Sequence, residues 1–323
     1  MRYIIYGAGA IGGVIGARLF QYGHEVALIA RGDHYVSLHG DGLRLETPDE
    51  VVTLHVPTVD SPDRLTLAED DVVILAMKSQ DTRGALLQLA SNAPAHVSVV
   101  CAQNGVENER QALRHFENVY GMCVMMPATH LTPGVIAVYS SPISGLLDLG
   151  RWPEGVDERG HEIARALSSS TFDSVAREDI ARWKWGKLMM NLGNAVEAVC
   201  GREARGGTLT GLVREEGVAV LAGADIDYVE HEEDASRRGD LLSDRPVAGK
   251  VRGGGSSWQS LTRRAGSVET DYLSGEIVLQ GRLFGVATPV NELLQRLADE
   301  MAREHRLPGS VSEDNVLAML RAD

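Results

Sequence analysis

The first thirty residues join a short apolar run, a glycine-rich turn, a helical segment and a second apolar run, and this order restricts the fold most. The turn is a GxGxxG pattern made of Gly7, Ala8, Gly9, Ala10, Ile11 and Gly12. The sequence pattern predicts a helix over residues 14–22 and a strand over residues 24–30. Gly7 permits a tight turn, Gly9 lets a pyrophosphate approach the backbone, and Gly12 lets the helix pack on the strand. The alternative is a purely structural turn, but the complete unit favours dinucleotide binding, with phosphate held at the helix start.

The residue after the second strand indicates which dinucleotide binds. Proteins that hold the adenosine 2′-hydroxyl usually place an acidic residue there, whereas this chain has Arg31. A guanidinium suits a 2′-phosphate, through charge-assisted bidentate hydrogen bonds. The alternative is an ordinary surface arginine. We therefore expect NADP, as NADPH, to be the cofactor.

Composition restricts the possible partners. A length of 323 residues predicts two domains, and a formal net charge of −14 argues against nucleic acid or an anionic membrane as a partner. No apolar run approaches the roughly 18 residues of a membrane span, and the first strand starts at the N-terminus, so we expect a cytoplasmic protein. The three cysteines lack metal-site spacing. No metal ion is expected.

Two further apolar runs, residues 70–77 and 96–102, predict strands buried on both faces. Lys78 follows the first run and Asn104 follows the second. In an open α/β sheet, ligands bind beyond the carboxyl ends of the strands, so both residues are expected in one crevice with Gly7 and Arg31. The alternative for Lys78 is a solvated loop lysine without a ligand, and the alternative for Asn104 is a residue that only forms a turn.

The pattern of elements changes near Glu178. Before it, shorter apolar runs at 43–46, 51–56, 119–126, 134–140, 146–149 and 172–177 predict more strands; after it, helices are predicted over 179–200, 209–222, 227–238, 258–265, 269–284 and 289–303. The expected fold class is α/β, with an N-terminal Rossmann doubly wound sheet followed by a mostly α-helical C-terminal domain. The expected domains are 1–178, which binds NADP, and 179–323, which binds substrate.

The helix predicted over 179–200 carries a polar stripe. Lys187, Asn191 and Asn194 are spaced i, i+4 and i+7 and share one face, whereas most of the remaining surface is apolar. Such a helix is expected to be buried, and buried ammonium and amide groups need partners. A ligand is one candidate partner, and neighbouring backbone or a salt bridge is the other. Residues 253–257 are glycine-rich and predict a mobile loop, and the charges of 227–238 predict a solvated face.

These motifs, taken in order, resemble those of the ketopantoate reductase family, the NADPH-dependent 2-dehydropantoate 2-reductases. The resemblance rests on residues 7–12, Arg31, 78–80, 103–105, 187–191, 256–259, 269–275 and 288–291. It implies an active site between a Rossmann domain and a helical domain. Lys187 matches the family's catalytic lysine and Glu269 its second essential ionisable residue. Asn191 matches a substrate-contacting asparagine, Asn104 one near nicotinamide and substrate, and Lys78 a lysine near the 2′-phosphate or ribose.

The resemblance does not decide which residues match two of the family's substrate-binding positions. The family's second asparagine usually stands eight residues after the lysine, where this chain has Ala195, and Asn194 precedes it. The family serine aligns with Ser256 when Trp258 is matched and with Ser257 when the spacing to Glu269 is matched. The candidate substrate-binding residues are therefore Asn104, Asn191, Asn194, Ser256 and Ser257.

The expected activity is reduction of 2-dehydropantoate to pantoate in pantothenate biosynthesis, by hydride transfer to the 2-keto group. Lys187 is expected to polarise the ketone and supply the proton, and Glu269 to orient or reprotonate it. One alternative is a related NADP-dependent reductase of another 2-oxo acid or ketone, and a more distant one is a non-catalytic NADP-binding sensor. The expected partner is a small 2-oxo acid. The oligomeric state is left open, with a homodimer as one alternative.

Overall fold

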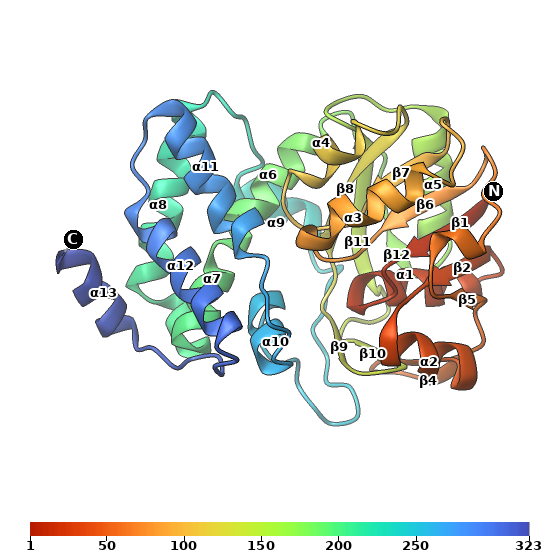
Figure 1. The fold of residues 1–323 in the computed structure, drawn as a ribbon, viewed down its shortest axis with the longest axis horizontal. Helices are drawn as coiled ribbons and strands as arrows, with labels where there is room; N and C mark the ends of the chain where they lie inside the picture. The colour runs from red at the N-terminus through yellow and green to blue at the C-terminus, as the bar shows by residue number, and fades with distance from the viewer. Residues whose placement is uncertain (323) are drawn as a thin grey trace. The chain divides into compact units, whose positions relative to one another are not determined.

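The computed structural model describes residues 1–322, with an α/β portion followed by a mostly helical portion (Figure 1). The expected fold class is confirmed. The chain forms two units, which are described separately: the first is Met1–Lys184 with Glu230–Arg252, and the second is Trp185–Val229 with the chain from Gly253 onward. The domain boundary after residue 178 stays a prediction. The observed division differs from that prediction in two respects: the first unit continues to Lys184, and residues 230–252 also belong to it.

An eight-stranded sheet forms the centre of the first unit. Its order is β12-β11-β8-β7-β6-β1-β2-β5, and all neighbours are parallel except β11 and β8. The strands are β1 (Arg2–Tyr6), β2 (Glu25–Ile29), β5 (Thr58–Val59), β6 (Val72–Leu75), β7 (Ser98–Cys101), β8 (Val119–Met125), β11 (Gly145–Arg151) and β12 (Phe172–Asp173). The chain builds outward from β1 to β2 and then crosses to β6 on the other side. This reversal is the point at which doubly wound sheets bind ligands.

A second sheet covers helix α1 (Ala10–Gln21) from the side opposite β1. Its order is β4-β3-β10-β9, from β3 (Leu43–Glu46), β4 (Val51–Leu54), β9 (Ala128–Thr132) and β10 (Val135–Val138). Ile5 of β1, Val14 and Ile15 of α1 and Ile136 of β10 belong to one buried cluster. A methyl group on Gly13 would overlap the Ile136 side chain, so α1 packs directly on β10. The N-terminal end of α1 is therefore held between two sheets.

The other helices of the first unit are α2 (Gly32–Asp41), the 3₁₀ turn η1 (Pro62–Arg64), α3 (Ser79–Ala90), α4 (Asn108–Ala112), α5 (Glu158–Ser168) and α9 (His231–Arg238). The strands predicted over residues 43–46 and 51–56 are confirmed, and they form the antiparallel pair β3 and β4. The prediction for α1 was wrong at its start, because the helix begins at Ala10 rather than Val14. Strand β9 and helix α3 were not predicted.

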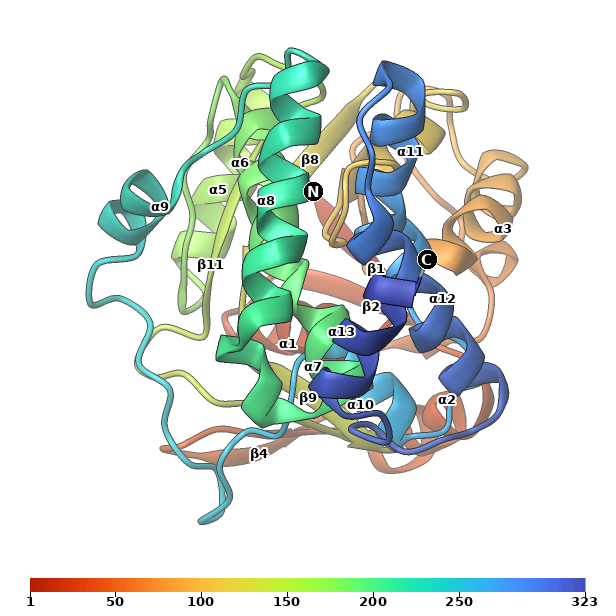
Figure 2. The ribbon, with the colours of Figure 1, turned by 90° about the vertical axis from the view of Figure 1, so that its left-hand side faces the viewer.

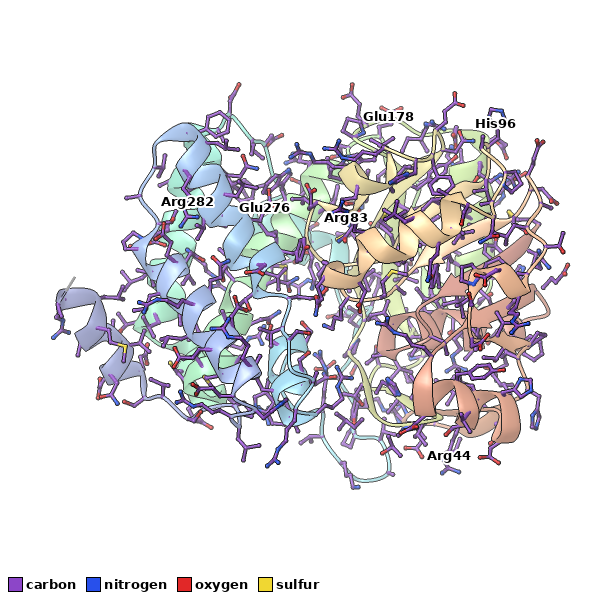
Figure 3. The ribbon with its side chains drawn as sticks, viewed as in Figure 1. Arg44, Arg83, His96, Glu178, Glu276 and Arg282 are labelled. Atoms are coloured by element: carbon purple, nitrogen blue, oxygen red, sulfur yellow. The ribbon has the colours of Figure 1, made fainter. Side chains whose placement is uncertain are left out.

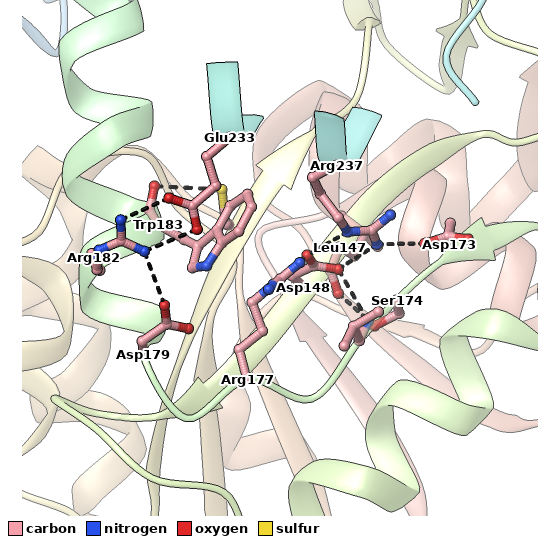
Figure 4. A network of polar contacts seen from close by, with 12 residues as sticks. Leu147, Asp148, Asp173, Ser174, Arg177, Asp179, Arg182, Trp183, Glu233 and Arg237 are labelled. Atoms are coloured by element: carbon pink, nitrogen blue, oxygen red, sulfur yellow. Dashed lines mark hydrogen bonds and ion pairs between the residues drawn. The ribbon is translucent and has the colours of Figure 1, made fainter. Parts of the chain in front are cut away.

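The solvated face predicted for residues 227–238 is confirmed at Glu230, Glu232 and Glu233, which are exposed, and was wrong for Arg237, which is bound within the first unit (Figure 4). Arg237 donates to Asp148 from Nε at 2.8 Å and from Nη2 at 2.7 Å, and also pairs with Asp173. Hydrogen bonding to Asp148 is the main cause that raises the pKa of Arg237. Glu233 pairs with Arg182 at 2.7 Å. These ion pairs explain why residues 230–252 belong to the first unit.

The second unit is a helical bundle. It contains most of α6 (Ile180–Asn191), α7 (Gly193–Cys200), η2 (Arg202–Gly206), α8 (Thr208–Gly223), α10 (Ser256–Thr262), η3 (Thr270–Tyr272), α11 (Ser274–Phe284), α12 (Pro289–Arg303) and α13 (Glu313–Ala322). Helices α8 and α12 pack on α7, and α11 packs on α8 and α12, with Val196, Val213, Ile277 and Leu294 buried together (Figure 2). None of the helices described has the length and apolar character needed to cross a membrane.

Three helix predictions were wrong in detail. The helix expected over 179–200 is interrupted at Leu192, next to Gly193, a residue of low helix propensity. The helix expected over 269–284 is the turn η3 followed by α11, and α10 begins at Ser256 rather than Trp258. Pro289 occupies the first turn of α12 as predicted.

His34 of α2 connects the glycine-rich turn to the four-stranded sheet. Its Nε2 donates to the Ala8 carbonyl at 2.7 Å, while the amide of Gly134, between β9 and β10, donates to Nδ1 at 3.0 Å. An accepting Nδ1 requires the neutral ring with its proton on Nε2. Burial lowers the pKa of His34, which favours this neutral form.

A buried ion pair connects α6 with α4. Lys184 donates to Glu109 and, at 2.9 Å, to the Gln103 carbonyl, and both charged side chains are almost fully buried. Burial raises the pKa of Glu109, an effect that the Lys184 ammonium opposes. The pair therefore holds the segment after β7 against α6.

We expect Lys184→Met to lower the free energy of unfolding by about 3–5 kcal/mol, because it leaves Glu109 buried without a counter-charge. The double variant Lys184→Met/Glu109→Leu should recover most of the loss, since no charge then remains to be desolvated. Urea denaturation of the three proteins measures both effects. A loss below about 1 kcal/mol in the single variant would contradict this account.

We expect His34→Leu to lower the free energy of unfolding by about 1–3 kcal/mol at pH 8, because the Ala8 carbonyl and Gly134 amide lose their partner. Since the folded-state pKa of His34 is lowered, its stabilising contribution is complete above about pH 6.5 and declines below it. The difference between wild type and variant should therefore shrink in acid. His39→Leu is the matched control on the same helix, because that ring makes a longer hydrogen bond, 3.3 Å, with the Thr58 carbonyl and a tilted contact with the Tyr35 ring. Equal losses in the two variants would disprove the role of His34.

Candidate functional site

Four adjacent strand ends form one edge of the first unit, which we call the nucleotide edge. Tyr6 at the end of β1 pairs with Ile29 of β2 and Leu75 of β6, and Leu75 pairs with Cys101 of β7. The strands therefore end level with one another. The candidate residues that follow these ends are Gly7, Arg31, Lys78 and Asn104. Their expected gathering at one sheet edge is confirmed, and their contact with a ligand stays a prediction.

The glycine-rich turn at this edge has the shape that a pyrophosphate needs. Gly7 has φ +100°, and a methyl group there would lie 2.6 Å from the Met77 amide nitrogen. A methyl group on Gly12 would lie 2.8 Å from Ile5 Cγ2. Gly9 is different, because its methyl group would meet one atom only within 4 Å, at 3.9 Å. The predicted roles of Gly7 and Gly12 are confirmed, and the space beside Gly9 fits a close phosphate.

The first turn of α1 also suits an anion. Gly9 is its N-cap and supplies no side-chain hydrogen bond, and the first turn, all of it described, contains no acidic residue. The amides of Ala10 and Ile11 begin the helix, where the positive end of the helix dipole lies. The residues present therefore fit the phosphates of a dinucleotide.

Arg31 lies beside an acidic residue of α3. Its Nη2 lies 2.7 Å from Asp81 Oδ2, and 76 % of its side chain is exposed. Lys78, half-buried, is the N-cap of the same helix. A phosphate that reaches Arg31 would thus replace the Asp81 carboxylate as its partner.

Buried amide side chains hold the ends of β6 and β7 together. Gln103 donates to the Met77 carbonyl at 3.0 Å and to Thr82 Oγ1 at 2.7 Å. Asn108 donates to the Asn104 carbonyl at 3.0 Å and accepts from Thr82 at 2.8 Å. The backbone that carries Asn104 is therefore fixed by residues that the sequence analysis did not select.

The polar stripe of α6 and α7 is largely buried, as predicted. Asn191 ends α6 and Asn194 lies in the first turn of α7, and their exposed fractions are 7 % and 5 %. Lys187 is half-buried. Leu192, at the interruption, keeps helical torsion angles of φ −57° and ψ −35°, so the spacing along the stripe survives.

The two candidate serines lie beside this stripe. They open α10, and a methyl group on their neighbour Gly255 would lie 2.9 Å from Asn194 Oδ1. The Gly255 amide donates to Glu197 Oε2 at 3.0 Å. The hydroxyl oxygens of Ser256 and Ser257 are both buried without a hydrogen-bond partner in residues 1–322. Buried hydroxyls normally have a partner, and a ligand or water near these two would supply one.

Glu197 was missed by the sequence analysis. It is 3 % exposed and pairs with Arg205 at 2.5 Å. Because one oxygen of its carboxylate also accepts the Gly255 amide, it fixes the start of α10 against α7. Its position three residues after Asn194, on the same face of α7, was the available signal.

The glycines before the serines contact an aromatic ring. A methyl group on Gly253 would lie 2.9 Å from Trp258 Cζ3, and one on Gly254 would lie 2.7 Å from Trp258 Cβ. The glycines therefore make room for the indole, which is an alternative explanation for this composition. The mobility of 253–257 stays a prediction.

Glu269 is buried, with 4 % exposed, and immediately precedes η3. Its segment is anchored to α12, where Thr270 donates to Asp299 Oδ1 at 3.0 Å. Burial, together with the nearby charge of Asp271, raises the pKa of Asp299 to about 6. The backbone of the candidate Glu269 is therefore held by α12.

Another buried carboxylate of this unit, Glu276 on α11, was not selected (Figure 3). It accepts a hydrogen bond from Gln280 Nε2 at 2.8 Å, one helical turn later. The family resemblance gives a reaction role to Glu269 and none to Glu276.

Comparisons with known proteins identify the family of the chain. Residues 3–154 match the model of the ketopantoate reductase PanE/ApbA family, and residues 179–302 match the model of its C-terminal domain. The chain is 26% identical to the 2-dehydropantoate 2-reductase of Pyrococcus horikoshii, over 92% of this chain and 96% of that protein. It is 27% identical to the Halobacterium salinarum enzyme of the same name, over 93% and 97%.

Solved structures show the same fold. A PanE/ApbA family ketopantoate reductase from Ralstonia eutropha JMP134 superposes with a TM-score of 0.78 at 26% identity, covering 94% of this chain and 99% of that one. A D-mandelate dehydrogenase with NADH and anilino(oxo)acetate has a TM-score of 0.81 at 24% identity, with the same coverage. The family models match most of the chain, which therefore belongs to the ketopantoate reductase PanE/ApbA family and is an oxidoreductase of that family.

Proposed function

We propose that this protein uses NADPH to reduce 2-dehydropantoate to pantoate, a step of pantothenate biosynthesis. The observation that carries the proposal is the pair of buried serine hydroxyls, Ser256 and Ser257, next to Asn194. Their missing hydrogen bonds match what the carboxylate or hydroxyl groups of a small 2-oxo acid supply. Lys187, on the same stripe as Asn194, adds the cation that such an acid requires.

In the proposed reaction, each of the candidate residues of the second unit has a separate role. The bound nicotinamide supplies the hydride. Lys187 polarises the keto oxygen, stabilises the negative charge that develops there and donates a proton to it. Glu269 orients Lys187 or returns its proton. Asn191, with one of the serines, holds the substrate so that its carbonyl carbon faces the hydride donor.

Lys187→Ala should lower kcat by at least about 100-fold, because the variant lacks both the charge and the proton at the keto oxygen. Steady-state oxidation of NADPH at 340 nm measures this. Lys250→Ala, which removes an exposed lysine from the first unit, is the matched control and should leave kcat unchanged. A near-normal kcat for Lys187→Ala would remove Lys187 from the catalytic role.

Arg31→Ala should raise the dissociation constant of NADPH by roughly tenfold or more and leave that of NADH unchanged, because only NADPH has the 2′-phosphate. Asp81→Asn should have the opposite effect on the dissociation constant of NADPH. It releases Arg31 from its ion pair and should tighten NADPH binding. Fluorescence titration measures both cofactors, and equal weakening of NADPH and NADH by Arg31→Ala would contradict a 2′-phosphate contact.

A reductase of another 2-oxo acid is the second candidate. Trp258 supports it, because this indole packs on Gly253 and Gly254 immediately before the serines and brings an aromatic group close to them. A larger or more apolar 2-oxo acid would use such a surface better than the compact, hydroxylated 2-dehydropantoate.

A substrate panel separates the candidates. NADPH oxidation should be measured with 2-dehydropantoate, pyruvate, 2-oxoisovalerate, and longer and aromatic 2-oxo acids. The highest kcat/KM with 2-dehydropantoate supports the main proposal, and the highest value with another acid supports the second. NADPH binding without turnover of any acid would support a third reading, a non-catalytic NADP-binding sensor.

A further inference from the structure

The side chain of His130 borders the space beside Gly9, and neither the family motif nor the sequence analysis identified it. The atom that a methyl group on Gly9 would meet, at 3.9 Å, is Nδ1 of His130. Gly9 is the position at which a dinucleotide pyrophosphate approaches the backbone. His130 belongs to β9, which was not predicted from the sequence, and it reaches this turn from the four-stranded sheet.

The position of His130 is fixed by a second histidine. The rings of His34 and His130 lie with their centroids 4.1 Å apart and their planes at 41°. His34 is itself held at both nitrogens, by the Ala8 carbonyl and the Gly134 amide. The His34 ring is therefore anchored to the glycine-rich turn and to the β9–β10 turn at once, and the His130 ring packs against it.

We propose that His130 is a cofactor-binding residue whose Nδ1 donates a hydrogen bond to the pyrophosphate of the bound dinucleotide. This inference rests on the proposed dinucleotide cofactor. Backbone amides at the start of α1 approach the pyrophosphate from one side, and the imidazole approaches it from the β9 side. His34 is a positioning residue, since it acts through His130 and through the Ala8 carbonyl.

The chemistry of the chain favours such a donor. Its formal net charge is −14, so a pyrophosphate with two negative charges approaches against an unfavourable field. Hydrogen bonds to charged groups are stronger than neutral ones, and each offsets part of that repulsion. A half-buried imidazole supplies this bond without placing a permanent charge against the turn.

Two variants separate the donor from the ring. His130→Phe keeps an aromatic ring against His34 and removes the donor. His130→Asn loses most of the ring contact but keeps an N–H donor near the position of Nδ1. His96→Phe is the control, because it makes the same substitution at an exposed histidine of the first unit (Figure 3).

The measurement is equilibrium binding of NADPH and of adenosine 2′-monophosphate, which has the 2′-phosphate but no pyrophosphate. We expect His130→Phe to raise the dissociation constant of NADPH roughly tenfold, and His130→Asn and His96→Phe to stay within about threefold of wild type. Binding of adenosine 2′-monophosphate should be unchanged in all three variants.

Several results would overturn the inference. These are unchanged NADPH binding in His130→Phe, equal weakening of NADPH and adenosine 2′-monophosphate, or a loss in His130→Asn as large as that in His130→Phe. The last two would assign His130 a structural role. Failure of the proposed cofactor is distinguishable, because the wild-type protein would then not bind NADPH before any variant is tested.

Discussion

The first unit depends on a contact between two backbone segments. Gly7 turns the chain at φ +100° so closely to Met77 that a methyl group would lie 2.6 Å from the Met77 amide nitrogen. This contact brings the turn after β1 against the segment after β6, at the point where the sheet order reverses. Because α1 begins three residues later, its amides are directed to the same edge as Lys78. A side chain at position 7 would separate these elements.

Buried polar groups have different tasks in the two units. In the first unit, the donor groups of Gln103, Asn108 and Lys184 have protein partners that fix the backbone beside Asn104, and only single oxygens of Gln103 and Glu109 in this described network lack one. In the second unit, the hydroxyls of Ser256 and Ser257 have none in the part of the chain that is described. A satisfied network stabilises a conformation, whereas an unsatisfied buried group costs free energy until a ligand or water reaches it. The unsatisfied groups are therefore better evidence for binding.

The sequence was informative wherever local periodicity determines structure. The glycine-rich turn, the level strand ends and the fold class were predicted, because buried parallel strands and amphipathic helices have distinct patterns. Strand β9 was missed because Ala128–Thr132 includes polar residues and becomes a strand by pairing with β10. Likewise, the role of Arg237 depends on Asp148, which is 89 residues away in the chain. Such pairings are set by tertiary contact, which local patterns do not encode.

The same limit explains why Lys187 was selected and Lys184 was not. Both lie on α6, and Lys184 stands three residues before Lys187 and seven before Asn191, so spacing alone places it on the same helix face. Lys184 faces Glu109, 75 residues away, and the neutralising pair makes it a structural group. Burial of a lysine thus does not by itself identify a catalytic one.

The pair between Arg31 and Asp81 has a consequence for cofactor choice. Both side chains are substantially exposed, and ion pairs of that kind contribute only about 0–1 kcal/mol. Exchanging the Asp81 carboxylate for a 2′-phosphate, which has more charge and more acceptor oxygens, is therefore favourable at low cost. A cofactor without that phosphate leaves the original pair in place and gains nothing from Arg31. In the proposed NADPH complex, discrimination at this position arises from competition between the 2′-phosphate and Asp81 for the Arg31 guanidinium.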